Sequence, residues 1–245
     1  MTWGLSMTDI AVPFVNKKDQ FELPAGIIYL DGNSLGPLPI RSRKRIAQVV
    51  SDEWGAMLIG GWNKADWIGL PRRTGDAIGR LIGAPQGSVL CADTTSINMF
   101  KALSSALQLN GARKVVLSDT GNFPSDLYIA QGLLNNYGAD YQLKSVAPEA
   151  VVDAMDDSVA VLLLTEVDYR TGRKHDMKAL TKLAHEKDIL TIWDLCHSAG
   201  ALPVDLSGAD ADFAVGCTYK YLNGGPGSPA FIYVNPRHSD NINPL

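Results

Sequence analysis

Short runs rich in Val, Ile and Leu alternate along the chain with longer stretches whose apolar residues recur at helical spacing. The short runs predict β-strands at Lys114–Leu117, Tyr141–Val146, Val159–Thr165, Ile189–Trp193, Phe213–Cys217 and Ala230–Val234. The longer stretches predict helices at Arg41–Leu58, Asp66–Ile82, Ser125–Asn136, Pro148–Met155 and Met177–Lys187. This alternation predicts a three-layer α/β/α fold whose mostly parallel sheet is buried on both faces.

Two helix starts carry further signals. Thr95 and Ser96 open a stretch in which Ile97, Phe100 and Leu103 recur at helical spacing, so we expect a hydroxyl-rich N-cap there. The helix over Asp66–Ile82 requires that its proline, Pro71, lie in the first turn. We expect the first two dozen residues to lie over the surface of the domain.

Composition and charge exclude several classes of protein. The net charge of −4 and the absence of a long basic block argue against a nucleic-acid partner. The longest apolar run, Val159–Leu164, is far shorter than the roughly 20 residues of a membrane span, and the N-terminus shows no secretory signal. Three cysteines without paired spacing, Cys91, Cys196 and Cys217, fit a reducing compartment, so we expect a cytoplasmic protein.

Polar residues follow four of the predicted strands, where ligands of parallel sheets collect. These segments are SDTGNFPSD after residue 117, Glu166–Asp168, Asp194–His197 and Thr218–Tyr221. Together they supply carboxylates, an imidazole, hydroxyls, a phenol and one amine.

The amine of Lys220, the carboxylate of Asp194 and the helix start at Thr95 form the set that pyridoxal phosphate requires. The amine makes the Schiff base, the carboxylate keeps the pyridine nitrogen protonated, and the helix N-terminus holds the phosphate. No metal site is expected, because the four histidines show no ligand spacing with cysteines or carboxylates. Cys196 is expected to be a buried structural residue and not a nucleophile.

Four segments resemble the kynureninase family of fold-type-I pyridoxal-phosphate enzymes. They are YLDGNSLGPLP (29–39), FPSD (123–126), DLCHSAGALPVDL (194–206) and TYKYLNGGPGSPAF (218–231). Related class-V enzymes usually carry a His before the Schiff-base lysine, whereas this chain has Tyr219. The DGNSLG segment is a second feature that separates the kynureninase family from those relatives. The resemblance runs from about residue 8 to the last residue.

The resemblance implies a role for each matching residue. Lys220 would form the Schiff base and then move the substrate Cα proton, and Tyr219 would assist that transfer and bind the phosphate. The other implied cofactor contacts are the pyridine partner Asp194, His197 beside the ring, Thr95 and Ser96 at the phosphate, the ring-facing wall Phe123, Pro124, Ser125 and Asp126, and Thr165 at its strand end.

The implied reaction is hydrolysis of L-kynurenine or 3-hydroxykynurenine to anthranilate or 3-hydroxyanthranilate and L-alanine, in tryptophan catabolism by the kynurenine pathway and in NAD biosynthesis. The partner is a small amino-acid substrate, and the implied assembly is a homodimer. Two alternatives stay open. The chain could be another class-V enzyme, such as a cysteine desulfurase, lyase or aminotransferase, or a catalytically impaired cofactor-binding fragment.

We expect residues 1–40 to form an N-terminal segment and residues 41–245 a cofactor-binding large domain, without the C-terminal small domain that the family carries. Two loops remain open to interpretation. Gly224–Gly227 is expected to be a tight turn beside the cofactor and not a dinucleotide fingerprint. The turn Asp168–Gly172 is either an anion-binding turn or a solvated loop.

Overall fold

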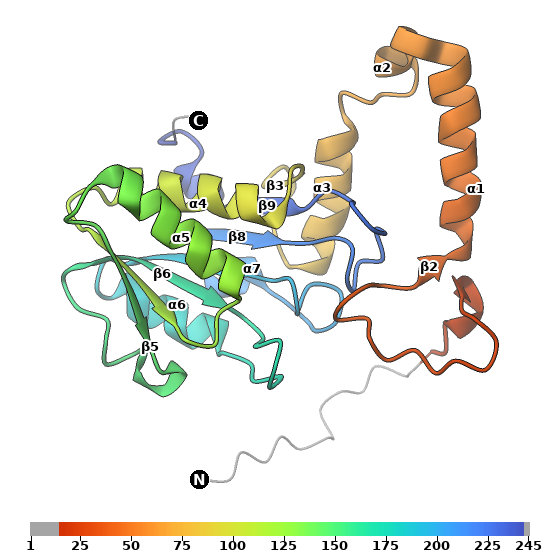
Figure 1. The fold of residues 1–245 in the computed structure, drawn as a ribbon. Coiled ribbons are helices and arrows are strands. Elements are labelled where there is room, and N and C mark those ends of the chain that lie inside the picture. The colour runs from red at the N-terminus through yellow and green to blue at the C-terminus, as the bar shows by residue number, and fades with distance from the viewer. Residues whose placement is uncertain (1–14, 243–245) are drawn as a thin grey trace.

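A computed structural model describes residues 15–242, and a seven-stranded sheet forms its centre (Figure 1). The strands lie in the order β3-β9-β8-β7-β6-β4-β5. Their bounds are β3 Val89–Cys91, β4 Val115–Asp119, β5 Gln142–Val146, β6 Val159–Thr165, β7 Leu190–Asp194, β8 Phe213–Gly216 and β9 Phe231–Val234. Only β9 runs against its neighbours, since it pairs antiparallel with both β8 and β3 while all other pairs are parallel.

Helices cover both faces of this sheet. One face carries α4 (Thr95–Leu109) and α5 (Pro124–Tyr137), and the other carries α6 (Met177–His185), α7 (Leu206–Ala209) and the end of α3 (Leu70–Leu81). From Val161 to Leu164, successive residues of β6 alternate between the two cores, with Leu162 packing on the α6 side and Leu163 on the α4 side. The predicted three-layer, mostly parallel α/β/α fold is therefore confirmed.

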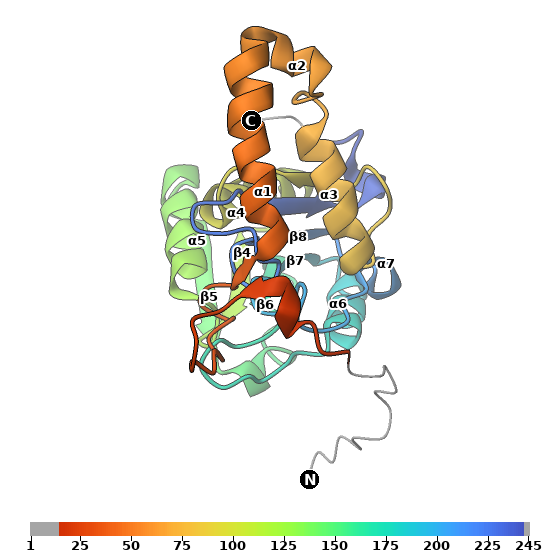
Figure 2. The same ribbon diagram turned by 90° about the vertical axis from the view of Figure 1, so that its right-hand side faces the viewer.

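The segment immediately before α3 forms an arm that stands away from the sheet (Figures 1 and 2). The arm, residues 40–69, consists of α1 (Ile40–Gln48), the π-helical η2 (Val49–Gly55), the 3₁₀ turn η3 (Leu58–Gly60) and α2 (Gly61–Lys64). Before it come η1 (Lys18–Gln20) and the two-stranded sheet of β1 (Phe21–Glu22) and β2 (Leu38–Pro39). Only Gly61 is buried within these helices. Most of the arm's apolar surface therefore has no cover in the described chain.

The predicted strands and helices of the sheet domain match most of the observed ones, and several elements differ. The helix predicted over Arg41–Leu58 changes to π-helix at Val49, and the next helix starts at Leu70 with Pro71 in its first turn. The predicted helix Pro148–Met155 is wrong: only one 3₁₀ turn, η4 (Pro148–Ala150), forms before two consecutive valines, whose branched side chains disfavour a helix.

The short strand β3, the helix α7 and the 3₁₀ turn η5 (Pro236–His238) were not predicted. We predicted that the first two dozen residues lie over the surface. Residues 1–14 of this segment lie outside the described residues. From residue 15 to residue 20 the chain is exposed.

Candidate cofactor site

A cavity of about 180 Å³ lies where β7 and β8 end and α4 and α5 begin. It is lined by Thr94, Thr95, Ser96, Phe123, Ser125, Asp126, Asp194, Cys196, Tyr219 and Lys220. The structure thus brings most of the predicted site residues to one cavity from four separate parts of the sequence. Pro124, Thr165 and His197 do not line it: Pro124 is exposed in the first turn of α5, and the other two are buried nearby.

The Lys220 amine is held at this cavity by an imidazole. Lys220 is 6% exposed, and its Nζ lies 2.8 Å from Nε2 of His197. Nζ also lies 5.4 Å from the centroid of the Phe123 ring and 5.7 Å from that of the Tyr219 ring. Burial lowers the pKa of His197, and the Lys220 charge lowers it further, so the imidazole is neutral and accepts a hydrogen bond from the amine.

Two buried carboxyl groups, those of Asp126 and Asp194, line the same cavity. Asp194 ends β7, and its Oδ1 accepts the backbone N–H of Cys196 at 2.8 Å. Burial raises the pKa of Asp126 well above its ordinary value, and the neighbouring Asp194 raises it further, against the opposing effect of Lys220. Asp126 is therefore held in its protonated form in the folded protein.

The N-terminus of α4 opens onto the same cavity. Thr94 is the capping residue, since its side-chain oxygen accepts the backbone N–H of Ile97 at 3.3 Å. The predicted cap at Thr95 and Ser96 is therefore one residue too late, and these two residues form the first turn. Their backbone N–H groups, which have no carbonyl partner within the helix, make this terminus a favourable place for an anion. Thr94 was missed although the sequence already showed a run of hydroxyl residues.

Aromatic rings surround the lysine and histidine. The ring of Tyr169 lies edge-on to Phe123 at 5.0 Å between centroids and stacks on His197 at 6.1 Å. Sequence reasoning missed Tyr169, which lies in the turn that we had interpreted as anion-binding or solvated. Burial raises the pKa of Tyr219 to about 12, so its hydroxyl is a neutral donor at pH 7.

The DGNSLG segment packs directly on the lysine loop. The backbone N–H of Gly36 donates to the Tyr219 carbonyl at 2.8 Å. A side chain at Gly36 would collide with the Lys220 carbonyl and would lie 2.9 Å from Cα of Asn223. The glycine at this position is therefore required by a close approach of two backbones.

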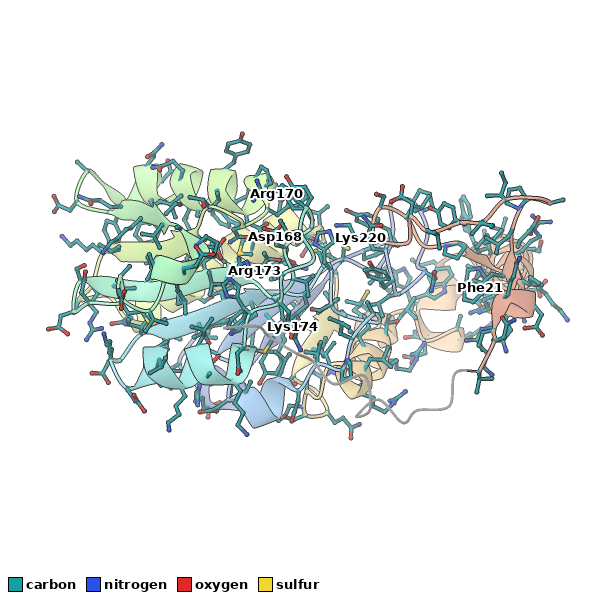
Figure 3. All side chains as sticks on the ribbon, turned by 90° about the horizontal axis from the view of Figure 1, so that it is seen from below. Phe21, Asp168, Arg170, Arg173, Lys174 and Lys220 are labelled. Atoms are coloured by element: carbon teal, nitrogen blue, oxygen red, sulfur yellow. The ribbon has the colours of Figure 1, made fainter. Side chains whose placement is uncertain are left out.

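The loop after β6 is held together by its own charges. Figure 3 shows its Asp168, Arg170, Arg173 and Lys174 gathered on the sheet side of the molecule with Lys220, far from Phe21. The Asp168 carboxylate accepts the backbone N–H groups of Arg170 and Thr171 at 2.8 and 3.2 Å. Because these amides are already bonded, the turn is not built for an external anion. A tight turn is present within the expected segment, with the Ser228 N–H donating to the Gly225 carbonyl at 3.2 Å.

A larger hollow of about 460 Å³ lies at the opposite end of the sheet, where Asp212 precedes β8. The polar groups there bond one another: Asp212 accepts from His185 and His238 at 2.8 Å each and from Arg237 at 2.6 Å. This hollow therefore presents satisfied groups and not a binding set. Residues 15–242 contain no group of three His, Cys, Asp or Glu side chains placed to hold a metal ion.

The groups around the smaller cavity fit pyridoxal phosphate. Two buried side-chain atoms at or beside it lack hydrogen-bond partners among the described residues, namely Oδ2 of the lining residue Asp126 and Nδ1 of His197, which bonds Lys220. Such unpaired buried groups indicate a polar ligand, because leaving each one unsatisfied costs about 1–3 kcal/mol. The amine, the carboxylate pair, the aromatic wall and the helix N-terminus match the aldehyde, pyridine nitrogen, ring and phosphate of this cofactor.

The profile of the aminotransferase class-V family matches residues 72–245. The chain belongs to the class-V aminotransferase family. The sequence is also similar to curated kynureninases: it is 52% identical to that of Deinococcus radiodurans over 241 residues, which cover 96% of this chain and 58% of the relative. The kynureninase of Pseudomonas fluorescens is 53% identical over 228 residues, covering 91% of this chain and 55% of that relative. The chain thus spans little more than half the length of these relatives.

Several solved structures share this fold. A C-DES mutant with glycine covalently linked to its PLP cofactor superposes with a TM-score of 0.81 at 16% identity, covering 94% of this chain and 62% of that one. The cysteine desulfurase CsdA of Escherichia coli gives a TM-score of 0.76 at 16% identity, with 93% and 59% covered. These likenesses show the fold, which agrees with the predicted fold-type-I architecture. None of the helices described here is both long and apolar enough to cross a bilayer.

Proposed function

We propose that this chain binds pyridoxal phosphate at Lys220 and hydrolyses L-kynurenine or 3-hydroxykynurenine to the corresponding anthranilate and L-alanine. The observation that carries the proposal is the buried Lys220 amine, 2.8 Å from His197 and in the same cavity as Asp194. The similarity to kynureninases at 52–53% identity supports the substrate. This function belongs to tryptophan catabolism and, through it, to NAD biosynthesis.

Each group at the cavity has a part in binding the cofactor. Asp194 would bind the protonated pyridine nitrogen, and the first turn of α4 at Thr95 and Ser96 would bind the phosphate with Tyr219. The ring would lie beside Phe123 and His197, with the remaining contacts supplied by Pro124, Ser125, Asp126 and Thr165. When bound, the cofactor supplies an electron sink for negative charge at the substrate Cα.

Lys220 and His197 would handle the protons. Lys220 can bond the cofactor aldehyde only as a free amine, and the neutral His197 imidazole, whose Nε2 lies 2.8 Å from Nζ, would orient that amine by a hydrogen bond. Once substrate has displaced it, the same amine is positioned to take the proton from the substrate Cα. Tyr219, whose pKa is raised to about 12, stays protonated at neutral pH and can donate a hydrogen bond.

The direct test combines covalent labelling with product detection. Chain mixed with pyridoxal phosphate and reduced with borohydride should carry the added mass on the Lys220 peptide. Kynurenine should then yield fluorescent anthranilate. Lys220→Ala should abolish both signals, while Lys101→Ala, a half-exposed α4 lysine paired with Asp93, should retain both.

The outcomes separate the parts of the proposal. A label without anthranilate, but with pyruvate or sulfide released from another amino acid, would contradict the substrate and keep the cofactor. Folded protein without a label at Lys220 would contradict the cofactor itself.

We also propose that the chain forms a homodimer in a reducing, cytoplasmic compartment. The exposed apolar side chains of the arm support a protein partner, among them Trp54 at 65%, Leu58 at 65% and Ile59 at 80% exposure. The three free cysteines support the compartment. Sedimentation at micromolar concentration should give the dimer mass, and Trp54→Lys should shift it toward monomer; a monomeric parent chain would contradict the assembly.

A further inference from the structure

Two cysteine thiols meet at the back of the cofactor cavity. Cys196 lies in the turn after β7, Cys217 directly follows β8, and both are buried, at 8% and 3% exposure. The backbone N–H of Cys217 donates to Cys196 Sγ at 3.2 Å, and Cys217 Sγ lies 3.9 Å from the Cys196 carbonyl oxygen. Each thiol therefore contacts the backbone of the other residue.

The two residues follow the ends of neighbouring parallel strands. Asp194 pairs with Val215 in the parallel ladder, and the two cysteines are each two residues further along. Neighbouring strands lie about 4.8 Å apart, within the Cα separation of about 4.4–6.8 Å that a disulfide requires. Rotation of the side chains, without separating the strands, can bring the sulfurs together. The third thiol, Cys91, belongs to β3 and lies 3.9 Å from the Pro229 carbonyl oxygen.

The environments of the two thiols assign them different reactivities. The Cys196 thiol lowers the pKa of Cys217 by more than burial raises it, and the Lys220 charge lowers it further. Interaction with Cys217, together with burial, raises the pKa of Cys196 well above its ordinary value. Cys217 is thus the thiol that ionises first, and a thiolate is the nucleophilic form of cysteine. Cys196 is the one that lines the cavity.

We propose that Cys196 and Cys217 form a redox-active pair, which hydrogen peroxide entering through the cofactor cavity converts to a disulfide. The Cys217 thiolate takes the proton of the Cys196 thiol, and the Cys196 sulfur, which lines the cavity, attacks one peroxide oxygen; the O–O bond breaks, and the departing hydroxide takes a proton to become water. The Cys217 sulfur then attacks the resulting sulfenic sulfur of Cys196, and the S–O bond breaks with release of a second water. The two thiols lose two electrons and two protons in total, and the peroxide is reduced to two molecules of water.

Occupancy of the cavity should control this reaction. Peroxide reaches the pair through the cavity that Cys196 lines, so a bound cofactor would close the route. This protection rests on the proposed function, whereas formation of the disulfide does not.

The first experiment treats the cofactor-free chain with hydrogen peroxide, blocks the remaining thiols and maps the peptides by mass spectrometry. The expected product is a dithiothreitol-reversible linked peptide containing Cys196 and Cys217, with Cys91 still open to alkylation. Cys196→Ser and Cys217→Ser should each abolish the linked peptide, and the matched Cys91→Ser should keep it. Unlinked sulfinic acids at residues 196 and 217 in the parent chain, or oxidation confined to Cys91, would overturn the proposal.

The second experiment repeats the oxidation with pyridoxal phosphate at 100 times its dissociation constant. If only the empty cavity admits peroxide, the rate of disulfide formation should fall about 100-fold. Borohydride labelling of Lys220 in the same samples reports occupancy independently. Fast oxidation of fully labelled protein would overturn the protection, whereas absence of the label would contradict only the proposed cofactor.

Discussion

Lys220 Nζ and His197 Nε2 lie 2.8 Å apart, in a part of the protein where both side chains are more than nine-tenths buried. No carboxylate lies within 4.0 Å of this amine among the described residues. The neutral imidazole therefore serves as the hydrogen-bond acceptor that an ion pair would otherwise supply.

The first prediction concerns the pH dependence of stability. Burial and the Lys220 charge lower the pKa of His197 below 6.5, so the unfolded chain binds this proton at higher pH than the folded chain does. The free energy of unfolding should therefore be unaffected by His197 above pH 6.5 and should decrease below it, by at most about 1.4 kcal/mol per pH unit. Urea unfolding at pH 7.5, 6 and 5 measures this decrease. His197→Gln should make it smaller, and an identical slope in the variant would contradict the assignment.

Asp126→Asn should stabilise the protein at neutral pH. Burial raises the pKa of Asp126 well above 3.8, and Asp194 raises it further, so above pH 3.8 the unfolded chain ionises this group while the folded chain holds it protonated. Because only the unfolded chain ionises Asp126, the free energy of unfolding falls as the pH rises above 3.8. An amide does not titrate, so Asp126→Asn removes this loss of stability. Denaturant unfolding at pH 7 and pH 3.5 should show a gain for the variant only at pH 7. A loss of more than about 1 kcal/mol at pH 7 would mean that Asp126 is ionised in the folded protein.

Much of the fold could be predicted from the sequence because buried parallel strands leave a strong pattern. Every residue of β6 is buried, and the predicted strand Val159–Thr165 has the observed bounds. The strand β3 was missed because it has only three residues, one of them exposed. The reversed direction of β9 depends on long-range pairing with β8 and β3, which no local pattern records.

The site could be predicted as far as strand ends and helix starts determine it. Lys220, Asp194 and the α4 terminus were found because they follow such boundaries. Tyr169 was missed because its contacts with Phe123 and His197 join segments more than 25 residues apart in sequence. The protonation of Asp126 also could not be predicted, since it depends on burial and on its distance from Asp194.

A third prediction concerns the opposite end of the sheet. Asp212 is 1% exposed and accepts hydrogen bonds from His185, His238, Arg237 and Thr191. Removing this buried acceptor with Asp212→Ala should cost about 3–5 kcal/mol of unfolding free energy, because its partners are left unpaired. Asp210→Ala is the matched control: Asp210 bonds the same Arg237 from a position that is 60% exposed, and its loss should cost less than about 1 kcal/mol.

The same carboxylate predicts an acid limit of stability. Burial would raise the pKa of Asp212, yet the hydrogen bonds from His185, His238, Thr191 and Arg237 lower it far below its ordinary value of 3.8. The contribution of the Asp212 carboxylate to the free energy of unfolding is therefore present above pH 3.8 and is lost as the pH falls below that value. Parent and Asp212→Ala chains should converge in unfolding free energy as the pH falls below 3.8. A constant difference between them down to pH 2 would contradict this role.

The last prediction tests why the DGNSLG segment carries its second glycine. A methyl group at Gly36 would collide with the Lys220 carbonyl and lie 2.9 Å from Cα of Asn223, so the lysine loop must shift. Gly36→Ala should therefore lower the yield of borohydride label at Lys220 at least tenfold, through displacement of the amine from the cavity.

Gly132→Ala supplies the matched control. Gly132 is exposed within α5 and has open space where the methyl group would lie, so this substitution should raise the unfolding free energy by about 0.5–1 kcal/mol and leave the label unchanged. Far-ultraviolet circular dichroism separates a local shift from unfolding in the Gly36 variant. A folded Gly36→Ala protein that labels as well as the parent would show that the amine position does not depend on this contact.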